Sequence, residues 1–156
     1  MNYNPEFMKR AIELSIQNIE KGGGPFAAVI VKDGKIIAEC GNSVTLTNDP
    51  TAHAEINAIR SACQSLGTFD LTGSDIYSSC EPCPMCLSAI YWAHIDHIYY
   101  GNTKRDAARI GFDDSFIYNE IKLKPDRRQI LSQQVMAYDA IRAFEIWDKK
   151  EDKTKY

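Results

Sequence analysis

The chain has 156 residues, of which 44% are hydrophobic and 25% charged, and these values fit one ordinary domain and exclude a disordered chain. Its longest apolar run, residues 26–31, is too short for a membrane-spanning helix, and its first residues lack the basic and apolar parts of a signal peptide, so we expect a cytoplasmic protein. The net charge is -3, with -6 on residues 1–121 and +3 on residues 122–156, so a small-molecule partner is expected rather than nucleic acid or membrane.

The N-terminal part predicts a helix followed by a hairpin. Apolar residues at helical spacing indicate an amphipathic helix over residues 5–21, which the glycines of residues 22–25 end. We interpret those glycines as a connection only, because a phosphate-binding loop opens a helix after a strand. Two apolar runs, residues 26–31 and 36–40, flank Asp33-Gly34. This pattern predicts an antiparallel pair joined by a tight turn.

The middle of the chain alternates helices and strands. Helical spacing covers residues 51–66, and a short strand follows at residues 76–78. Pro82 is expected to open the next helix, and residues 97–101 form the next strand. Strands that alternate with helices imply parallel pairing, with the helices covering the sheet.

The C-terminal part gives weaker patterns. We expect a helix over residues 116–121, an edge strand over residues 130–136 and a helix over residues 138–150. Residues 148–156 are mostly charged, which indicates a solvated, frayed end. No repeat or linker divides the chain, so residues 1–156 are expected to form one domain. Three side chains of the last helix are expected to be buried: Ile141, Phe144 and Ile146.

Three residues have the character of zinc ligands. The chain has five cysteines, and an odd number in a reducing compartment favours metal binding or catalysis over disulfides. His53 stands at the start of one predicted helix, and Cys83 and Cys86 stand at the start of the next. Structural zinc sites have four protein ligands, whereas three ligands leave a position for water. Three ligands therefore indicate catalysis, and Glu55, two residues from His53, is the natural proton acceptor.

Cys80 leaves two alternatives open. Together with the two cysteine ligands it forms Cys-x-x-Cys-x-x-Cys, the first part of a bacterial iron-sulfur run, but the fourth cysteine is replaced by Ile90. Cys80 could also close the zinc site as a fourth ligand, which would make the protein a non-catalytic structural zinc module. We expect Cys80 instead to pack as a small apolar residue, as do Cys40 and Cys63.

Two motifs together resemble a known family. Residues 51–55, Thr-Ala-His-Ala-Glu, and residues 79–86, Ser-Cys-Glu-Pro-Cys-Pro-Met-Cys, resemble the cytidine deaminase superfamily of zinc-dependent nucleobase deaminases. That superfamily includes cytosine, guanine and tRNA adenosine deaminases, and these motifs do not separate its members. Residues 111–118, Gly-Phe-Asp-Asp-Ser-Phe-Ile-Tyr, and the end Lys155-Tyr156 resemble the short bacterial guanine deaminases.

The resemblance implies a three-layer α/β/α fold with a mixed central sheet that starts with an antiparallel hairpin. It also implies hydrolysis of guanine to xanthine and ammonia by a homodimer whose C-terminal segments, about residues 122–156, are exchanged. A tRNA adenosine or free cytosine deaminase with the same zinc centre is the alternative. By position, one Zn²⁺ per chain is bound by His53, Cys83 and Cys86, and Glu55 and Asp114 are catalytic. The residues implied to contact the base are Asn42, Phe26, Ala54, Asp114 and, from the partner subunit, Tyr156.

Hydrogen-bond chemistry independently favours guanine. The N1 and 2-amino groups of guanine both donate hydrogen bonds, and an ionised carboxylate such as that of Asp114 only accepts them. Adenine N1 and cytosine N3 are acceptors, so either base would leave buried groups unpaired at a cost of roughly 1 to 3 kcal/mol each. The sequence physics alone does not decide whether Asp113 or Asp114 faces the pocket.

Overall fold

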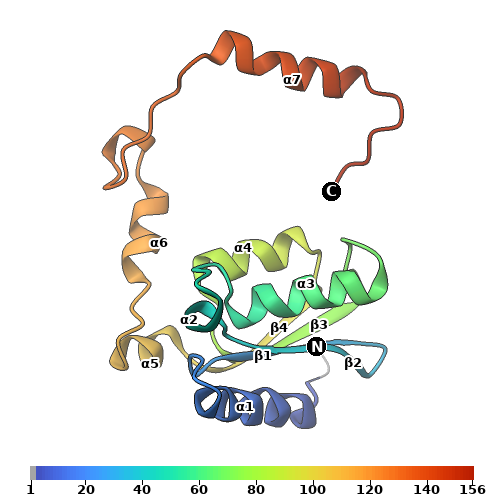
Figure 1. The fold of residues 1–156 in the computed structure, drawn as a ribbon, viewed down its shortest axis with the longest axis vertical. Coiled ribbons are helices and arrows are strands. Elements are labelled where there is room, and N and C mark those ends of the chain that lie inside the picture. Colours follow the sequence, from blue (N-terminus) through green and yellow to red (C-terminus); the bar gives the residue numbers. More distant parts are fainter. Residues whose placement is uncertain (1–2) are drawn as a thin grey trace. The chain divides into compact units, whose positions relative to one another are not determined.

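Four strands form one sheet in the order β2-β1-β3-β4 (Figure 1). In the computed structural model, which describes residues 3–156, the strands are β1 (Ala27–Lys32), β2 (Lys35–Gly41), β3 (Ser74–Cys80) and β4 (His97–Asn102). β1 pairs antiparallel with both β2 and β3, and β3 pairs parallel with β4. The sheet is therefore mixed and includes the predicted hairpin.

The turn of that hairpin has the geometry that its sequence predicts. Asp33 and Gly34 both have positive φ, 50° and 71°, as the two central residues of a type I′ turn require. The expectation of parallel pairing holds for β3 and β4 but is wrong for β2 and β3, because β1 lies between them. β1 is buried along almost its whole length, whereas β2 has a single buried residue, so the more apolar strand takes the central position.

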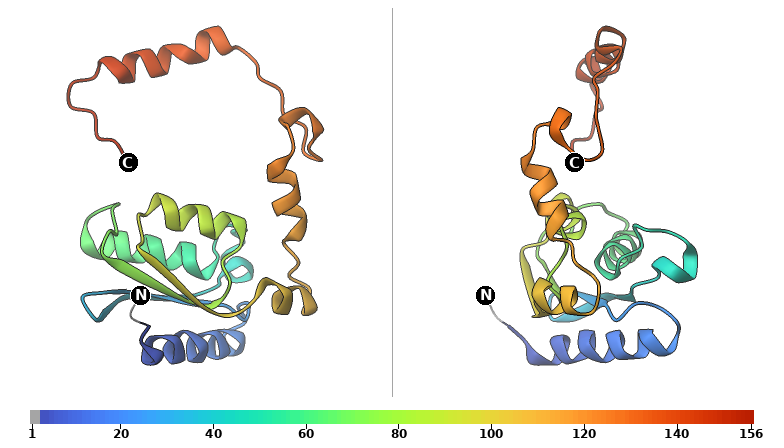
Figure 2. Two further views of the ribbon diagram at one scale, coloured as in Figure 1. Left: turned by 180° about the vertical axis from the view of Figure 1, so that it is seen from behind. Right: turned by 90° about the vertical axis from the view of Figure 1, so that its left-hand side faces the viewer.

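Helices cover both faces of the sheet and give three layers (Figures 1 and 2). α1 (Pro5–Glu20) packs on one face, and α3 (Ala54–Leu66) and α4 (Pro84–Trp92) pack on the other. The short helices α2 (Val44–Thr47) and α5 (Lys104–Arg109) lie in the connections. Within the described residues, no helix combines the length and the apolar character that crossing a bilayer requires.

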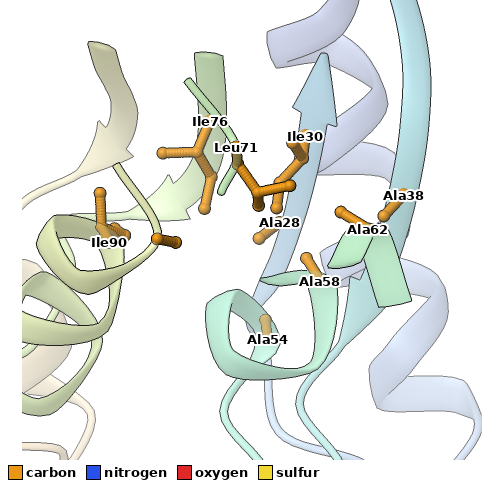
Figure 3. Packing of buried hydrophobic residues seen from close by; sticks show 10 residues of the cluster. Ala28, Ile30, Ala38, Ala54, Ala58, Ala62, Leu71, Ile76 and Ile90 are labelled. Carbon is orange, nitrogen blue, oxygen red and sulfur yellow. The ribbon is translucent and has the colours of Figure 1, made fainter. Parts of the chain in front are cut away.

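β1 supplies apolar side chains to both layers. Ala28 and Ile30 belong to the cluster under α3 and α4, whereas Val29 and Val31 belong to the cluster under α1. Figure 3 shows the first cluster, in which small α3 side chains allow that helix to lie close to the sheet. These side chains are Ala54, Ala58 and Ala62. The continuous apolar run of β1 thus reflects burial on two faces.

The contacts within the chain divide it into two units, residues 1–114 and residues 115–156. The second unit contains α6 (Ser115–Lys122), a short 3₁₀ turn (Pro125–Arg127) and α7 (Ala137–Lys149), so both predicted helices are confirmed. The edge strand expected over residues 130–136 is wrong, because these residues have no strand conformation and pair with no described strand.

The expected burial of three α7 side chains is also wrong within the single chain. Ile141, Phe144 and Ile146 are 46%, 73% and 69% exposed. A unit of 42 residues with two short helices has too few side chains to cover an apolar helix face by itself. Neither α6 nor α7 has a buried residue.

Candidate metal centre

The N-caps of α3 and α4 are His53 and Cys83, and neither side chain makes a capping hydrogen bond. Serine, threonine, asparagine and aspartate are the preferred N-caps, and losing such a cap costs about 1 kcal/mol. α4 begins at Pro84 rather than at Pro82, so Cys86 occupies the third helical position. This arrangement directs the side chains of both helix starts toward one point at the expense of helix capping.

The three predicted ligands converge. His53 Nδ1 lies 3.5 Å from the Sγ atoms of both Cys83 and Cys86, and all three ligand atoms lie within 4.8 Å of one another. Tetrahedral zinc, with bonds of roughly 2.3 Å to sulfur and 2.0 to 2.1 Å to nitrogen, would separate nitrogen and sulfur by about 3.6 Å. The spacing of the side chains therefore fits a zinc ion.

The electrostatics of the cluster favour thiolate formation. The Cys86 thiol and the His53 ring stabilise the negative charge of Cys83 through hydrogen bonds and lower its pKa to about 4. The hydrogen bond with Cys83, together with burial, raises the pKa of Cys86. The hydrogen bond with Cys83 also raises the pKa of His53. One negative charge is thus already favoured in the cluster, and a dication would stabilise both thiolates.

Cys80 lies outside this group of ligands. It is buried, its Sγ lies 3.7 Å from the backbone oxygen of Thr103, and burial raises its pKa to about 11. Among the residues that the structure describes, no fourth histidine, cysteine or acidic side chain joins the three ligand atoms. The interpretation of Cys80 as a packed apolar side chain is confirmed, and neither the iron-sulfur nor the closed zinc alternative gains support.

We expect Cys83→Ser to lose most of its zinc and Cys80→Ser to retain it. Serine is a poor zinc ligand at neutral pH, so the first change removes one of three ligands, whereas the second changes a side chain whose partner is a backbone carbonyl. Metal analysis of both purified variants checks this prediction. Zinc loss from Cys80→Ser would show that Cys80 closes the site.

Glu55 is buried beside the ligands. It is the second residue of α3 and is 7% exposed, and its Oε1 accepts a hydrogen bond of 3.2 Å from Ser78 Oγ. Burial raises the pKa of Glu55 above its ordinary value, and a carboxyl group outside the ligand set is a candidate for general acid-base work. Ser78 was not singled out from the sequence. The only feature of the sequence that could have indicated Ser78 is that it is a polar residue inside a buried strand, and such residues are common.

A backbone hydrogen bond joins Asn42 to Phe26. Asn42 is 9% exposed, and its N–H donates to the backbone oxygen of Phe26 at 3.0 Å. Asn42 Oδ1 accepts the N–H of Val44 at 3.2 Å, so its amide nitrogen keeps two donors for other partners. The half-buried ring of Phe26 packs edge to face on Phe112, with ring centroids 5.0 Å apart.

The two neighbouring aspartates differ in environment. Asp113 is exposed, whereas Asp114 is partly buried, and burial and the negative charge of Cys83 raise the pKa of Asp114. Of the two aspartates, Asp114 is therefore the one that interacts electrostatically with the ligand cluster. Ala54 is 1% exposed at the first position of α3, where backbone N–H groups have no partner within the helix. Tyr156 lies in the second unit and is 73% exposed.

Comparisons with known proteins agree with this site. The family described as the cytidine and deoxycytidylate deaminase zinc-binding region matches residues 1–102. Guanine deaminase of Bacillus subtilis is 51% identical over 151 residues, which cover 96% of this chain and 97% of that protein. The X-ray structure of guanine deaminase from B. subtilis superposes with a TM-score of 0.95 at 50% identity, covering 100% of this chain and 99% of that one.

Similarity to another kind of deaminase is shorter. A tRNA-specific adenosine deaminase of Agrobacterium fabrum is 46% identical over 95 residues, which cover 61% of this chain and 62% of that protein. The match to the B. subtilis guanine deaminase covers 96% of the chain and so extends through most of residues 115–156. The match to this tRNA-specific adenosine deaminase is therefore shorter than the match to the B. subtilis guanine deaminase.

Proposed function

The chain belongs to the cytidine and deoxycytidylate deaminase family, and on that premise we propose that it hydrolyses free guanine to xanthine and ammonia. One observation carries the chemistry: three converging ligands, with no fourth among the described residues, lie beside a buried carboxyl group. The near-complete similarity to a guanine deaminase, in contrast to the partial similarity to tRNA deaminases, supports guanine as the substrate.

The ligand set suits hydrolysis. His53, Cys83 and Cys86 would hold the zinc ion, and their two thiolates would offset its charge. When bound, zinc lowers the pKa of a water ligand from 15.7 to about 7 and so supplies a nucleophile at neutral pH. Glu55 lies on the same helix start as His53 but outside the ligand group, so its carboxylate is available for proton transfer.

Glu55 moves two protons in the proposed reaction. It accepts the first proton from the attacking water and delivers it to ring nitrogen N3 as the new bond between oxygen and C2 forms. It then takes the second proton of the water from the new C2 hydroxyl group and carries it to the 2-amino group, and the bond between C2 and nitrogen breaks to release ammonia and leave a carbonyl group at C2. Ser78 donates to Glu55 Oε1 and holds the carboxyl group in place. Water and guanine are thereby converted to xanthine and ammonia with no further reactant.

The residues around the ligands would recognise the base. Asp114 accepts the N1 and 2-amino hydrogens, and it is the second carboxylate beside the reacting carbon. The amide nitrogen of Asn42 donates to a ring or carbonyl acceptor, and the N–H of Ala54 at the start of α3 is a further donor. The ring of Phe26, braced by Phe112, packs on the face of the base.

We expect Asp114→Asn to lower kcat/KM for guanine by at least about tenfold, because the amide presents a donor where guanine also donates. The matched control is Asp113→Asn, which makes the same change at the adjacent exposed residue and should leave guanine turnover unchanged. Steady-state kinetics with guanine and adenine check both variants. Equal losses in the two variants would remove Asp114 from base recognition.

We further propose that the chain forms a homodimer whose second units are exchanged, so that Tyr156 of one copy completes the pocket of the other. Monomeric proteins rarely expose a large apolar surface on one segment, as the second unit does. A second copy of the chain is a partner that is always present to cover it. The second unit exposes apolar side chains on α6, on α7 and on the segment between them, and neither helix has a buried residue. These include Phe116, Ile121, Ile130, Leu131, Val135, Met136, Tyr138, Phe144, Ile146 and Trp147.

Ammonia release from several substrates tests the proposed function. The purified protein is assayed with guanine, adenine, cytosine, their nucleosides and tRNA, and zinc is measured on the same sample. We expect one zinc per chain and ammonia from guanine alone. Turnover of tRNA adenosine or cytosine without turnover of guanine would favour the alternative deaminases.

A further inference from the structure

The glycine run after α1 is more than the connection that the sequence suggests. The side chain of Asn18, near the end of α1, is 8% exposed and lies where this run meets the end of β2. Its Nδ2 donates to the backbone oxygen of Gly24 at 2.7 Å and to that of Asn42 at 2.8 Å. Both hydrogens of the amide group are thus used to hold two separate segments together.

These bonds are part of a closed circuit. Gly24 O also accepts the N–H of Phe26 at 2.8 Å, and Phe26 O accepts the N–H of Asn42 at 3.0 Å. The path runs from Asn18 through Gly24 and Phe26 to Asn42 and returns to Asn18. Two of its four members, Phe26 and Asn42, are residues proposed above to contact the base.

The sequence leaves room for this amide on two sides. A Cβ atom at Gly23 would lie 2.4 Å from Asn18 Nδ2, and one at Gly41 would lie 2.1 Å from Asn18 Oδ1. At both positions a side chain would displace the amide of Asn18, and at Gly23 it would also lie 2.5 Å from the backbone oxygen of Asn42. A Cβ at Gly24 would lie 3.2 Å from Asn42 Oδ1 and 3.4 Å from the ring of Phe26. The two side chains therefore flank the segment that Asn18 holds.

We propose that Asn18 is a positioning residue for guanine recognition. Asn18 fixes the distance between Phe26 and Asn42, and it does so from α1, which lies on the opposite face of the sheet from the metal cluster. This inference rests on the proposed function. Asn18 touches neither the zinc ligands nor Glu55 in any hydrogen bond of the described structure. Its effect is therefore on binding of the base and not on the metal or on proton transfer.

The test is the kinetics of Asn18→Ala. Misplacement of the two base contacts weakens binding before and during the reaction alike, so KM for guanine should rise by at least about tenfold with little change in kcat. Zinc content should equal that of the unaltered protein. Ala11→Gly is the matched control, because it loosens the same helix at a buried site under β1 and should leave KM unchanged.

A double-variant cycle separates positioning from general loosening. If Asn18 positions both Asn42 and Phe26, Asn18→Ala should raise KM by a smaller factor when Asn42→Ala is already present than in the unaltered protein, because only the contact from Phe26 is left to misplace. Should Asn18→Ala fail to fold, Asn18→Ser carries the same test, because its hydroxyl can satisfy only one of the two carbonyls. An unchanged KM, or a full additional rise in the Asn42→Ala background, overturns the inference. Absence of guanine turnover in the unaltered protein overturns the proposed function instead.

Discussion

Replacing Glu55 by glutamine should leave the zinc content unchanged and lower kcat by about 10²- to 10⁴-fold. The amide has nearly the shape of the carboxyl group, and its oxygen can still accept the hydrogen bond from Ser78. Zinc should stay bound because Glu55 is not one of the three ligands. What the amide cannot do is take a proton from water and return it to the leaving amine. Metal analysis and single-turnover kinetics on one preparation measure both effects.

The control makes the same substitution at the protein surface. Glu39→Gln removes an exposed ion pair with Arg10, and surface pairs of this kind contribute about 0 to 1 kcal/mol. Its turnover should equal that of the unaltered protein. Normal turnover in Glu55→Gln would exclude Glu55 as the proton carrier, and zinc loss from that variant would make it a ligand.

Deleting Tyr156 should lower kcat/KM for guanine by about tenfold or more, because the contact to the base that we propose for this residue would be lost. The melting temperature should change much less than turnover, since this terminal side chain adds little to the core of its own chain, in which it is 73% exposed. Lys155→Ala, which keeps Tyr156, is the control and should retain turnover. Kinetics and thermal unfolding on the same samples check the prediction. A loss of stability that matches the loss of activity would contradict it.

Co-expression of two defective chains tests the exchange itself. One chain lacks Tyr156 and the other carries Glu55→Gln, so each homodimer by itself should have at most about a tenth of the unaltered activity. In a mixed dimer, the chain with Glu55 receives Tyr156 from its partner and regains one complete site. With random pairing, activity should recover to about a quarter of that of the unaltered dimer. If Tyr156 serves its own chain, mixed dimers contain no complete site and no activity returns.

The candidate ligands could be predicted from the sequence because each stands at the start of a predicted helix, whereas their convergence across 30 residues is shown by the structure. His53, Cys83 and Cys86 stand at helix starts, and the first turn of a helix has only a few possible directions for its side chains. Glu55 follows from its position on the same turn. The hairpin could be predicted for the same reason, because Asp33-Gly34 permits the positive φ values of its turn.

Long-range contacts could not be predicted in this way. Ser78 reaches Glu55 from a strand 23 residues away, and Asn18 reaches Asn42 across 24 residues. A buried serine and a helical asparagine carry no sequence pattern of their own, because their partners are defined only when β3 and α1 have packed. The burial predicted for Ile141 failed for a related reason: amphipathic spacing shows that a face needs cover but not which surface supplies it.

The sequence by itself determined the hairpin, whose turn residues are adjacent, and the three candidate ligands, each of which stands at the start of a predicted helix. Only the tertiary structure decided the position of β1 between β2 and β3, the isolation of Cys80 from the ligands and the hydrogen-bond circuit through Asn18. The physical reason is that helix starts and tight turns are set by local backbone geometry. Strand order and buried polar contacts instead depend on which distant surfaces exclude water together.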